Sequence, residues 1–301
     1  MTSLRSSFAA VLLLFTASSA AAQADLAARL KDTQALMDSG DVAGAIKSLE
    51  AMVAVAPASF ETRLMLGRAL DLEGQHGAAR KHLEEALRIA PDDQRLSALM
   101  ALGISYAFES KPDESARYYQ RAFDAEMQAD DRAGAAGLAN ALGRIYLESG
   151  NLQKAEQWYT TGYETAKKIP DLPASQSALW DLRWHHALGR IAARRGNRAA
   201  AMKHAEEVRA LLDKGGNDNQ RPAYPYLVGY IEFFSKDYRR AVAELSKGDQ
   251  EDPFVLGLIA QAYQRLGDRE KATEYGRRVM ASPTHSINSA FARPLARASL
   301  R

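Results

Sequence analysis

Hydrophobic residues recur with a helical period along most of the chain, with polar residues between them. This pattern predicts helices joined in pairs. In one stretch a Leu-Gly step is followed by small and apolar residues three to five positions apart, at Leu66, Gly67, Leu70, Gly74, Ala79, Leu83 and Ala86. Apolar positions with such spacing lie on one face of a helix, and Gly74 marks the turn between the two helices. Strict alternation of the kind typical of strands is missing from the sequence. We therefore predict helical hairpins and no β-sheet.

The residue that breaks each hairpin recurs along the chain at Gly40, Gly74, Ser110, Gly150, Gly196, Lys236 and Gly267. The first interval is 34 residues, and the others range from 31 to 46 residues. Polar or Gly- and Pro-containing segments at 129–131, 168–173 and 214–219 indicate loops that account for the longer intervals. The sequence predicts a stack of about six to seven helical hairpins.

Small residues recur at matching places in the two helices of each hairpin. The first helix carries an apolar–glycine step, as in Leu66-Gly67, Leu102-Gly103, Leu142-Gly143, Leu188-Gly189 and Val228-Gly229, and the second carries Ala45, Ala79, Ser115, Ala155, Ala201, Ala241 or Ala272. Facing small residues let two helix axes approach to about 8–10 Å. We therefore expect Gly143 to face Ala155, and Gly143→Ala to be mild or stabilising.

These residues and the 34-residue interval resemble the tetratricopeptide repeat family. The resemblance covers about residues 26–286 and implies an all-α, right-handed superhelical solenoid. A helical bundle without repeats is the alternative. The sequence departs from the pattern at Thr33 and Ala260, where glycine is expected, and at Glu232 and Lys236 in the sixth hairpin.

The two ends of the chain differ from the repeats. Residues 1–24 combine one basic residue, a short apolar run and an Ala-rich end, which is typical of a cleavable signal peptide with cleavage near Gln23 or Asp25. A retained N-terminal anchor is the alternative. We assign residues 25–286 to the repeat array and 287–301 to a basic C-terminal tail, and expect a periplasmic or secreted protein.

Composition narrows the classes of function. The chain has 301 residues, 47% hydrophobic and 25% charged, which is ordinary for a folded protein. A formal net charge of +2 gives no electrostatic reason to expect nucleic acid or a membrane surface as partner. There is no cysteine, so disulfides, thiol catalysis and lipid attachment to a cysteine are excluded.

The sequence offers little sign of catalysis. His185 and His186 are adjacent and so point about 100° apart on a helix, although His204 on the next helix could approach one of them. Metal sites usually need three or more protein ligands. No nucleophile elbow or phosphate-binding glycine loop is present. We expect no enzyme activity, no cofactor and no metal site.

A binding surface is the more favoured hypothesis. The family resemblance implies that the first helix of each hairpin lines a concave groove, with the residue after the Leu-Gly step pointing into it. Here that residue is Arg68, Arg144 or Arg190, and Asn140, Arg183, His186 and Arg194 lie on the same helical face. Arginine can bond both oxygens of a carboxylate, which suggests protein or peptide partners with acidic groups. Alternatively the arginines are solvated or pair with Asp71 or Glu148 on their own helices.

Aromatic residues are concentrated in the sixth hairpin. Tyr226, Tyr230 and Phe233 are spaced four and three apart and form one stripe. Such a stripe is either core or an apolar pocket at the end of the groove.

Together these patterns predict a non-enzymatic scaffold of the bacterial cell envelope that binds protein or peptide segments. A structural assembly subunit and a metal-binding or enzymatic protein built on a helical solenoid remain the alternatives.

Overall fold

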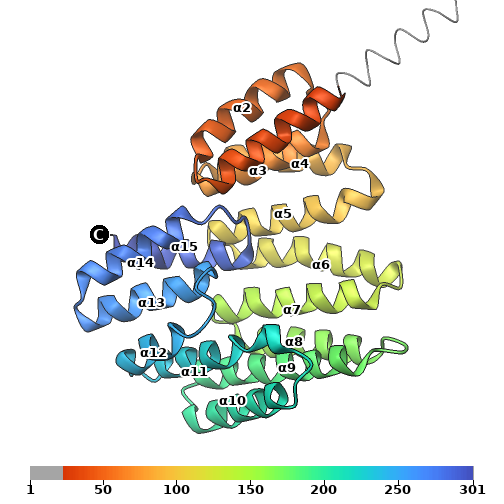
Figure 1. Cartoon of the computed structure of the whole chain (residues 1–301). Helices are drawn as coiled ribbons and strands as arrows, with labels where there is room; N and C mark the ends of the chain where they lie inside the picture. Colours follow the sequence, from red (N-terminus) through yellow and green to blue (C-terminus); the bar gives the residue numbers. More distant parts are fainter. Residues whose placement is uncertain (1–22, 301) are drawn as a thin grey trace, which may run out of the picture. The chain divides into compact units, whose positions relative to one another are not determined.

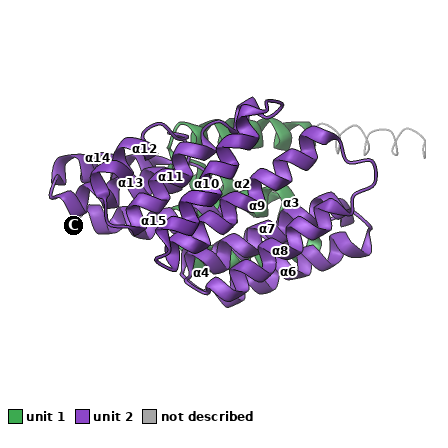
Figure 2. Ribbon diagram, turned by 90° about the horizontal axis from the view of Figure 1, so that it is seen from below, with its two compact units in different colours: residues 1–89 green, residues 90–301 purple. Residues whose placement is uncertain are grey.

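The structure, a computed structural model, describes residues 23–300, which contain helices and turns but no strand. The predicted signal peptide therefore lies almost wholly outside the described residues. The chain divides into two compact units, residues 1–89 and 90–301 (Figure 2). In the part of the chain that the structure describes, no helix has the length and apolar character to cross a membrane.

The first unit contains two hairpins. Residues 23–38 are helical and are followed by α2 (Val42–Val55), α3 (Phe60–Leu72) and α4 (His76–Ile89) (Figure 1). Buried Leu49, Leu66 and Leu83 form part of its core. Thr33, which stands where the repeat pattern expects glycine, is also buried, and its hydroxyl donates to the carbonyl of Arg29 at 2.7 Å. A polar residue is tolerated there because its own helix satisfies it.

The second unit contains five hairpins and one further helix. In chain order the helices are α5 (Arg95–Phe108), α6 (Pro112–Gln128), α7 (Arg132–Glu148), α8 (Leu152–Lys167), α9 (Ala174–Arg194), α10 (Arg198–Asp213), α11 (Ala223–Phe234), α12 (Tyr238–Leu245), α13 (Pro253–Leu266), α14 (Arg269–Ala281) and α15 (Ile287–Ser299). Each odd-numbered helix from α5 to α13 packs against the even-numbered helix that follows it. With the two hairpins of the first unit, this confirms the predicted all-α repeat array.

The predicted breaker residues all lie at the turns within hairpins. All seven have a positive φ, from 57° at Ser110 to 88° at Gly150. A residue in the left-handed backbone conformation ends a helix, and glycine adopts this conformation without steric cost. In five of the hairpins the next residue is an Asp or Asn whose side chain accepts from the backbone of the following helix, at Asp41, Asn151, Asn197, Asp237 and Asp268. The breaker and the N-cap therefore fit a turn of two or three residues.

The close contact between the helices of a hairpin differs from the prediction. A Cβ atom added to Gly143 would lie 2.7 Å from Cγ of Tyr159, and its nearest neighbours all belong to this ring rather than to Ala155. The same relation joins Gly67 to Leu83 and Gly103 to Tyr119. A long side chain on a helix leans back over the preceding turn, so Tyr159 covers the surface above Ala155. The closest contact of Gly143 is therefore with Tyr159, four residues after Ala155, and Gly143→Ala is not expected to be mild.

The departures in the sixth hairpin have a physical explanation. Glu232 is 1% exposed, and Arg198 donates to both of its carboxylate oxygens, at 2.6 and 3.1 Å. Arg240 lies 3.2 Å from the same carboxylate. A buried carboxylate at a position usually filled by an apolar residue is thus compensated by two arginines.

The last helices of the second unit fold back beside its first ones. Helix α15 packs against α13 and α14 and also against α5 and α7, which are remote in sequence (Figure 1). Its Ala290, Ala292 and Ala296 are buried, and buried Arg293 donates to the carbonyls of Met280 and Ser282. The segment 287–301, predicted as a basic tail, therefore contains a packed helix.

Candidate functional site

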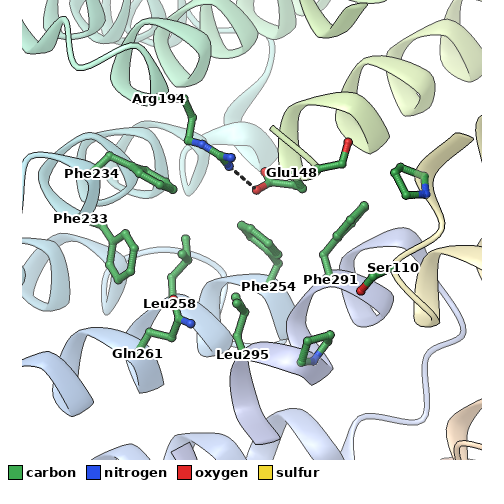
Figure 3. A pocket seen from close by; sticks show the side chains of 13 residues that line it. Ser110, Glu148, Arg194, Phe233, Phe234, Phe254, Leu258, Gln261, Phe291 and Leu295 are labelled. Carbon is green, nitrogen blue, oxygen red and sulfur yellow. Dashed lines mark hydrogen bonds and ion pairs between the residues drawn. The ribbon is translucent and has the colours of Figure 1, made fainter. Parts of the chain in front are cut away.

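A cavity of about 430 Å³ lies inside the second unit, between the fold-back helices and the ends of α7, α9 and α11 (Figure 3). We call it the aromatic cavity. Its walls come from six segments that are widely separated in the sequence. They comprise Ser110, Pro112, Glu148, Ser149, Arg194, Phe233, Phe234, Phe254, Leu258, Gln261, Phe291, Pro294 and Leu295.

The apolar walls follow from helical spacing. Phe254 and Leu258 are four residues apart on α13, and Phe291 and Leu295 are four apart on α15, so each pair projects from one face of its helix. Figure 3 shows these side chains around a common space. Phe233 and Phe234, at the end of α11, are in edge contact with ring centroids 5.3 Å apart. Four phenylalanines thus surround a space that is not filled by the protein.

A cluster of three arginines around Glu148 borders this cavity. Arg194 Nη1 lies 3.4 Å from Glu148 Oε2, and Arg144 Nε lies 3.3 Å from Glu148 Oε1. Arg190 Nη1 is 4.0 Å from the same Oε1. The Glu148 side chain is only 5% exposed. The cluster is therefore a largely desolvated ion network that joins α7 to α9.

Tyrosine hydroxyls extend this network. Arg144 Nη1 donates to the hydroxyl of Tyr226 at 3.0 Å, and Arg190 Nη2 donates to the hydroxyl of Tyr159 at 2.9 Å. The Arg144 guanidinium also lies over the ring of Phe254, 4.3 Å from its centroid. These contacts fix two guanidiniums whose side chains would otherwise be mobile.

The charges of the cluster act on nearby titratable groups. Burial, Arg190 and Arg144 together hold the pKa of His186 well below its usual value, so its ring is neutral at pH 7. Burial raises the pKa of Asp252, although Arg144 opposes this shift. The cluster therefore consists of three guanidiniums around Glu148, and Asp252 interacts electrostatically with one of them, that of Arg144.

The arginines predicted to line an open groove have different surroundings. Arg144 and Arg190 have side chains only 12% and 6% exposed, and the ring of Phe254 covers Arg144 whereas Arg190 lies against Tyr159. Arg144 pairs with Glu148, as one of the alternatives proposed. Arg68 lies on α3 in the first unit, where burial lowers its pKa. Because these arginines are buried or paired, replacing them is expected to change the stability of the protein.

The predicted groove residues on α7 and α9 do not all line one site. Asn140, Arg144 and Arg190 line a second, smaller cavity, whereas Arg194 lines the aromatic cavity. Arg183 lies over the ring of Trp180, 4.8 Å from its centroid, and lines neither of these two cavities.

The predicted aromatic stripe is divided between core and cavity. Tyr226 and Tyr230 are 9% and 0% exposed and belong to the hydrophobic core. His186 packs on Tyr226, with ring centroids 5.2 Å apart. Phe233 is half-buried and lines the aromatic cavity.

His204 does approach one of the adjacent histidines. Its Nδ1 lies 3.2 Å from Nδ1 of His185, on α9. Among the described residues there is no group of three or more His, Cys, Asp or Glu side chains that could hold a metal ion.

Sequence reasoning missed the centre of the network and half of the cavity wall. Glu148 was considered only as a local partner of arginine, although its i, i+4 spacing from Arg144 was a correct signal. Phe291 and Leu295 were assigned to a tail. Their spacing of four, with Ile287 four residues before Phe291, could have indicated a helix.

Comparisons with known proteins agree with this architecture. Tetratricopeptide repeat models match residues 36–103 and residues 94–168. Over residues 36–168 the chain is therefore similar to tetratricopeptide repeats. A comparison with the curated proteins gives no significant match.

Solved structures show the same fold at low sequence identity. A tetratricopeptide repeat protein from Parabacteroides merdae is 14% identical and has a TM-score of 0.53, with 89% of this chain and 97% of that chain covered. A putative kinesin light chain from Podospora anserina with nearly identical repeats is 21% identical and has a TM-score of 0.52, over 65% of this chain and 97% of that chain. A chain of the APC/C hetero-tetramer Cut9-Hcn1 aligns over 89% of this chain but only 48% of its own length, with 19% identity and a TM-score of 0.46.

Proposed function

We propose that this protein is a non-enzymatic interaction scaffold of the bacterial cell envelope, and that it holds a partner protein through the aromatic cavity. The tetratricopeptide repeats support a role in protein–protein interaction. The observation that carries the proposal is the cavity of about 430 Å³ whose four phenylalanines face one another without filling the space. Such a space is suited to a bulky apolar side chain of a partner segment.

The polar edge of the cavity would orient that segment. Ser110, Ser149 and Gln261 lie on its wall beside the Glu148–Arg194 ion pair. A mainly apolar pocket with a few polar groups at its margin is the usual form of a specific binding site. The partner is thus expected to insert an apolar side chain into the cavity. Its backbone is expected to form hydrogen bonds with the polar residues at the edge.

The aromatic cavity can be tested by partly filling it. Gln261→Trp places a large ring at the rim, from a half-buried position on α13. We expect the partner captured from envelope extracts by residues 25–301 to be lost with this variant, and its affinity measured by calorimetry to fall at least tenfold. Gln120→Trp, at an exposed position on α6 outside this cavity, is the matched control and should bind normally. Equal binding by both variants would rule out the aromatic cavity as the site.

Export is the second part of the proposal. It rests on the basic start, apolar run and Ala-rich end of residues 1–24. We expect protein purified from the cell envelope to begin near Gln23 or Asp25 when its N-terminus is sequenced. Protein that keeps Met1 and is recovered from the cytoplasm would contradict export, but would leave the binding proposal intact.

A further inference from the structure

A second cavity, of about 250 Å³, is lined by two members of the arginine cluster, Arg144 and Arg190. We call it the polar cavity. Helices α7, α8, α9 and α15 contribute to its wall. The polar side chains that line it are Asn140, Arg144, Tyr159, Arg190 and Asn288. This cavity differs from the aromatic cavity in that its wall is dominated by hydrogen-bond donors.

Several guanidinium N–H groups at this cavity form no hydrogen bond within the protein. They are Nε and Nη2 of Arg144 and Nε and Nη1 of Arg190, all of them buried. Arg144 Nε and Arg190 Nη1 have only the ion-pair contact to Glu148, at 3.3 and 4.0 Å. Nearly all buried hydrogen-bond donors in native proteins have an acceptor, and a charged donor left without one is especially unfavourable. Glu148 Oε1 is itself buried without a hydrogen bond and is the acceptor nearest to Arg144 Nε and Arg190 Nη1, so the donors that lack an acceptor in the protein are Arg144 Nη2 and Arg190 Nε.

The charge balance also lacks an anion. The guanidiniums of Arg144, Arg190 and Arg194 all lie within 4.0 Å of the Glu148 carboxylate, and Asp252 interacts electrostatically with Arg144. Asp252 is already engaged, because it accepts from the backbone N–H of Phe254 and from the side chain of Asn288. Among the described residues that line the polar cavity there is no carboxylate. One positive charge of the cluster thus has no counter-charge.

The first turn of α15 adds to the preference for negative charge. Ile287 and Asn288, the first two residues of this helix, lie on the cavity wall. The N-terminus of a helix carries a partial positive charge that favours anions. Tyr159 already accepts from Arg190, so its own hydroxyl proton is available for donation.

We propose that the polar cavity binds a small oxyanion, held between the guanidiniums of Arg144 and Arg190, with Asn140, Tyr159 and Asn288 as further donors. The ligand is a free anion of the size of phosphate or acetate, and the site is independent of the partner-binding function proposed for the aromatic cavity. Planar guanidiniums favour oxyanions because two of their N–H groups can bond two oxygens at once.

The test is titration of residues 25–301 with sodium phosphate and, separately, with sodium acetate, at constant ionic strength set by sodium chloride. We expect saturable binding of at least one anion by calorimetry, and a rise in Tm of about 5 °C at a hundredfold excess over Kd. Phosphate binding would assign the site to phosphate groups, and acetate binding to carboxylates. Absence of saturable binding for both anions would overturn the proposal.

Two variants locate the site. Arg190→Gln should reduce affinity at least tenfold, but it alters a buried ion network. Gly137→Leu leaves every arginine in place and adds a side chain at a helical glycine that lines the polar cavity and has no atom within 4 Å of an added Cβ. It should also abolish binding.

Gly77→Leu is the matched control, because Gly77 is a helical glycine on α4 with equally open surroundings. Phosphate stabilises proteins generally by exclusion from their surface, and this effect should be equal in both glycine variants. Anion binding that is undiminished in Gly137→Leu would show that the ligand lies elsewhere and would overturn the assignment.

Discussion

Replacing Glu148 by glutamine is expected to lower the free energy of unfolding by about 3–5 kcal/mol, the usual result of removing one partner from a buried ion pair. The Glu148 side chain is 5% exposed and lies within 4.0 Å of the arginines at 144, 190 and 194. Glutamine keeps the size of the side chain but removes its charge. Three largely buried guanidiniums then lose their shared carboxylate, and their mutual repulsion is no longer balanced.

The measurement is denaturant unfolding of residues 25–301, with Glu156→Gln as control. Glu156 pairs with Arg195 between α8 and α9 at 2.6 Å, but the two side chains are 42% and 46% exposed. Exposed pairs typically contribute about 0–1 kcal/mol, so the control should remain close to wild type. If both variants unfold alike, Glu148 is not the centre of a buried network.

The substitution Gly143→Ala is expected to cost about 1–3 kcal/mol through overpacking. The new Cβ would lie 2.7–2.8 Å from three atoms of the Tyr159 ring, including Cγ. That ring is 3% exposed and its hydroxyl is held by Arg190, so it has little freedom to move away. The cost of the clash exceeds the gain in helix propensity that alanine normally provides over glycine.

Gly137→Ala supplies the matched control on the same helix. An added Cβ at Gly137 has no neighbour within 4 Å, so alanine should stabilise the protein by roughly 0.5–1 kcal/mol. Opposite signs for the two substitutions in thermal or denaturant unfolding are therefore predicted. Stabilisation by both would mean that α7 and α8 are further apart than the structure has them.

The repeat architecture was predictable because its signals are local. Each breaker residue that the sequence indicates adopts a positive φ, even where it is Ser110 or Lys236 rather than glycine. The helical period and the small residues then identify the two helices of each hairpin. Such features depend on the backbone and on residues close in sequence, and one chain is enough to reveal them.

The candidate site was less predictable because it depends on contacts between remote segments. The sequence places Arg144 and Arg190 on one helical face, but it does not reveal that Phe254 lies beside Arg144 and that Asn288 lines the same cavity as both arginines. The fold-back of α15 onto α5 and α7 has no short-range signal. The register of Gly143 against Tyr159 likewise depends on side-chain direction, which spacing alone does not specify.

The two binding proposals concern different cavities of the second unit. The aromatic cavity is lined mainly by apolar side chains, whereas two arginines with unsatisfied buried donors line the polar cavity. Members of the arginine cluster line both cavities, so the stability of the cluster is a condition for both proposed sites. This arrangement separates the partner-binding proposal from the anion-binding proposal, and each can fail alone.

Site-specific photo-crosslinking tests the central claim most directly. A photoreactive amino acid in place of Gln261, at the rim of the aromatic cavity, is compared with the same amino acid in place of Gln120, on the exposed face of α6, in cells that make the protein. We predict that position 261 alone crosslinks to one partner protein, and that this is the protein lost from capture by Gln261→Trp. Crosslinking to that protein from position 120 but not from position 261 would contradict the account.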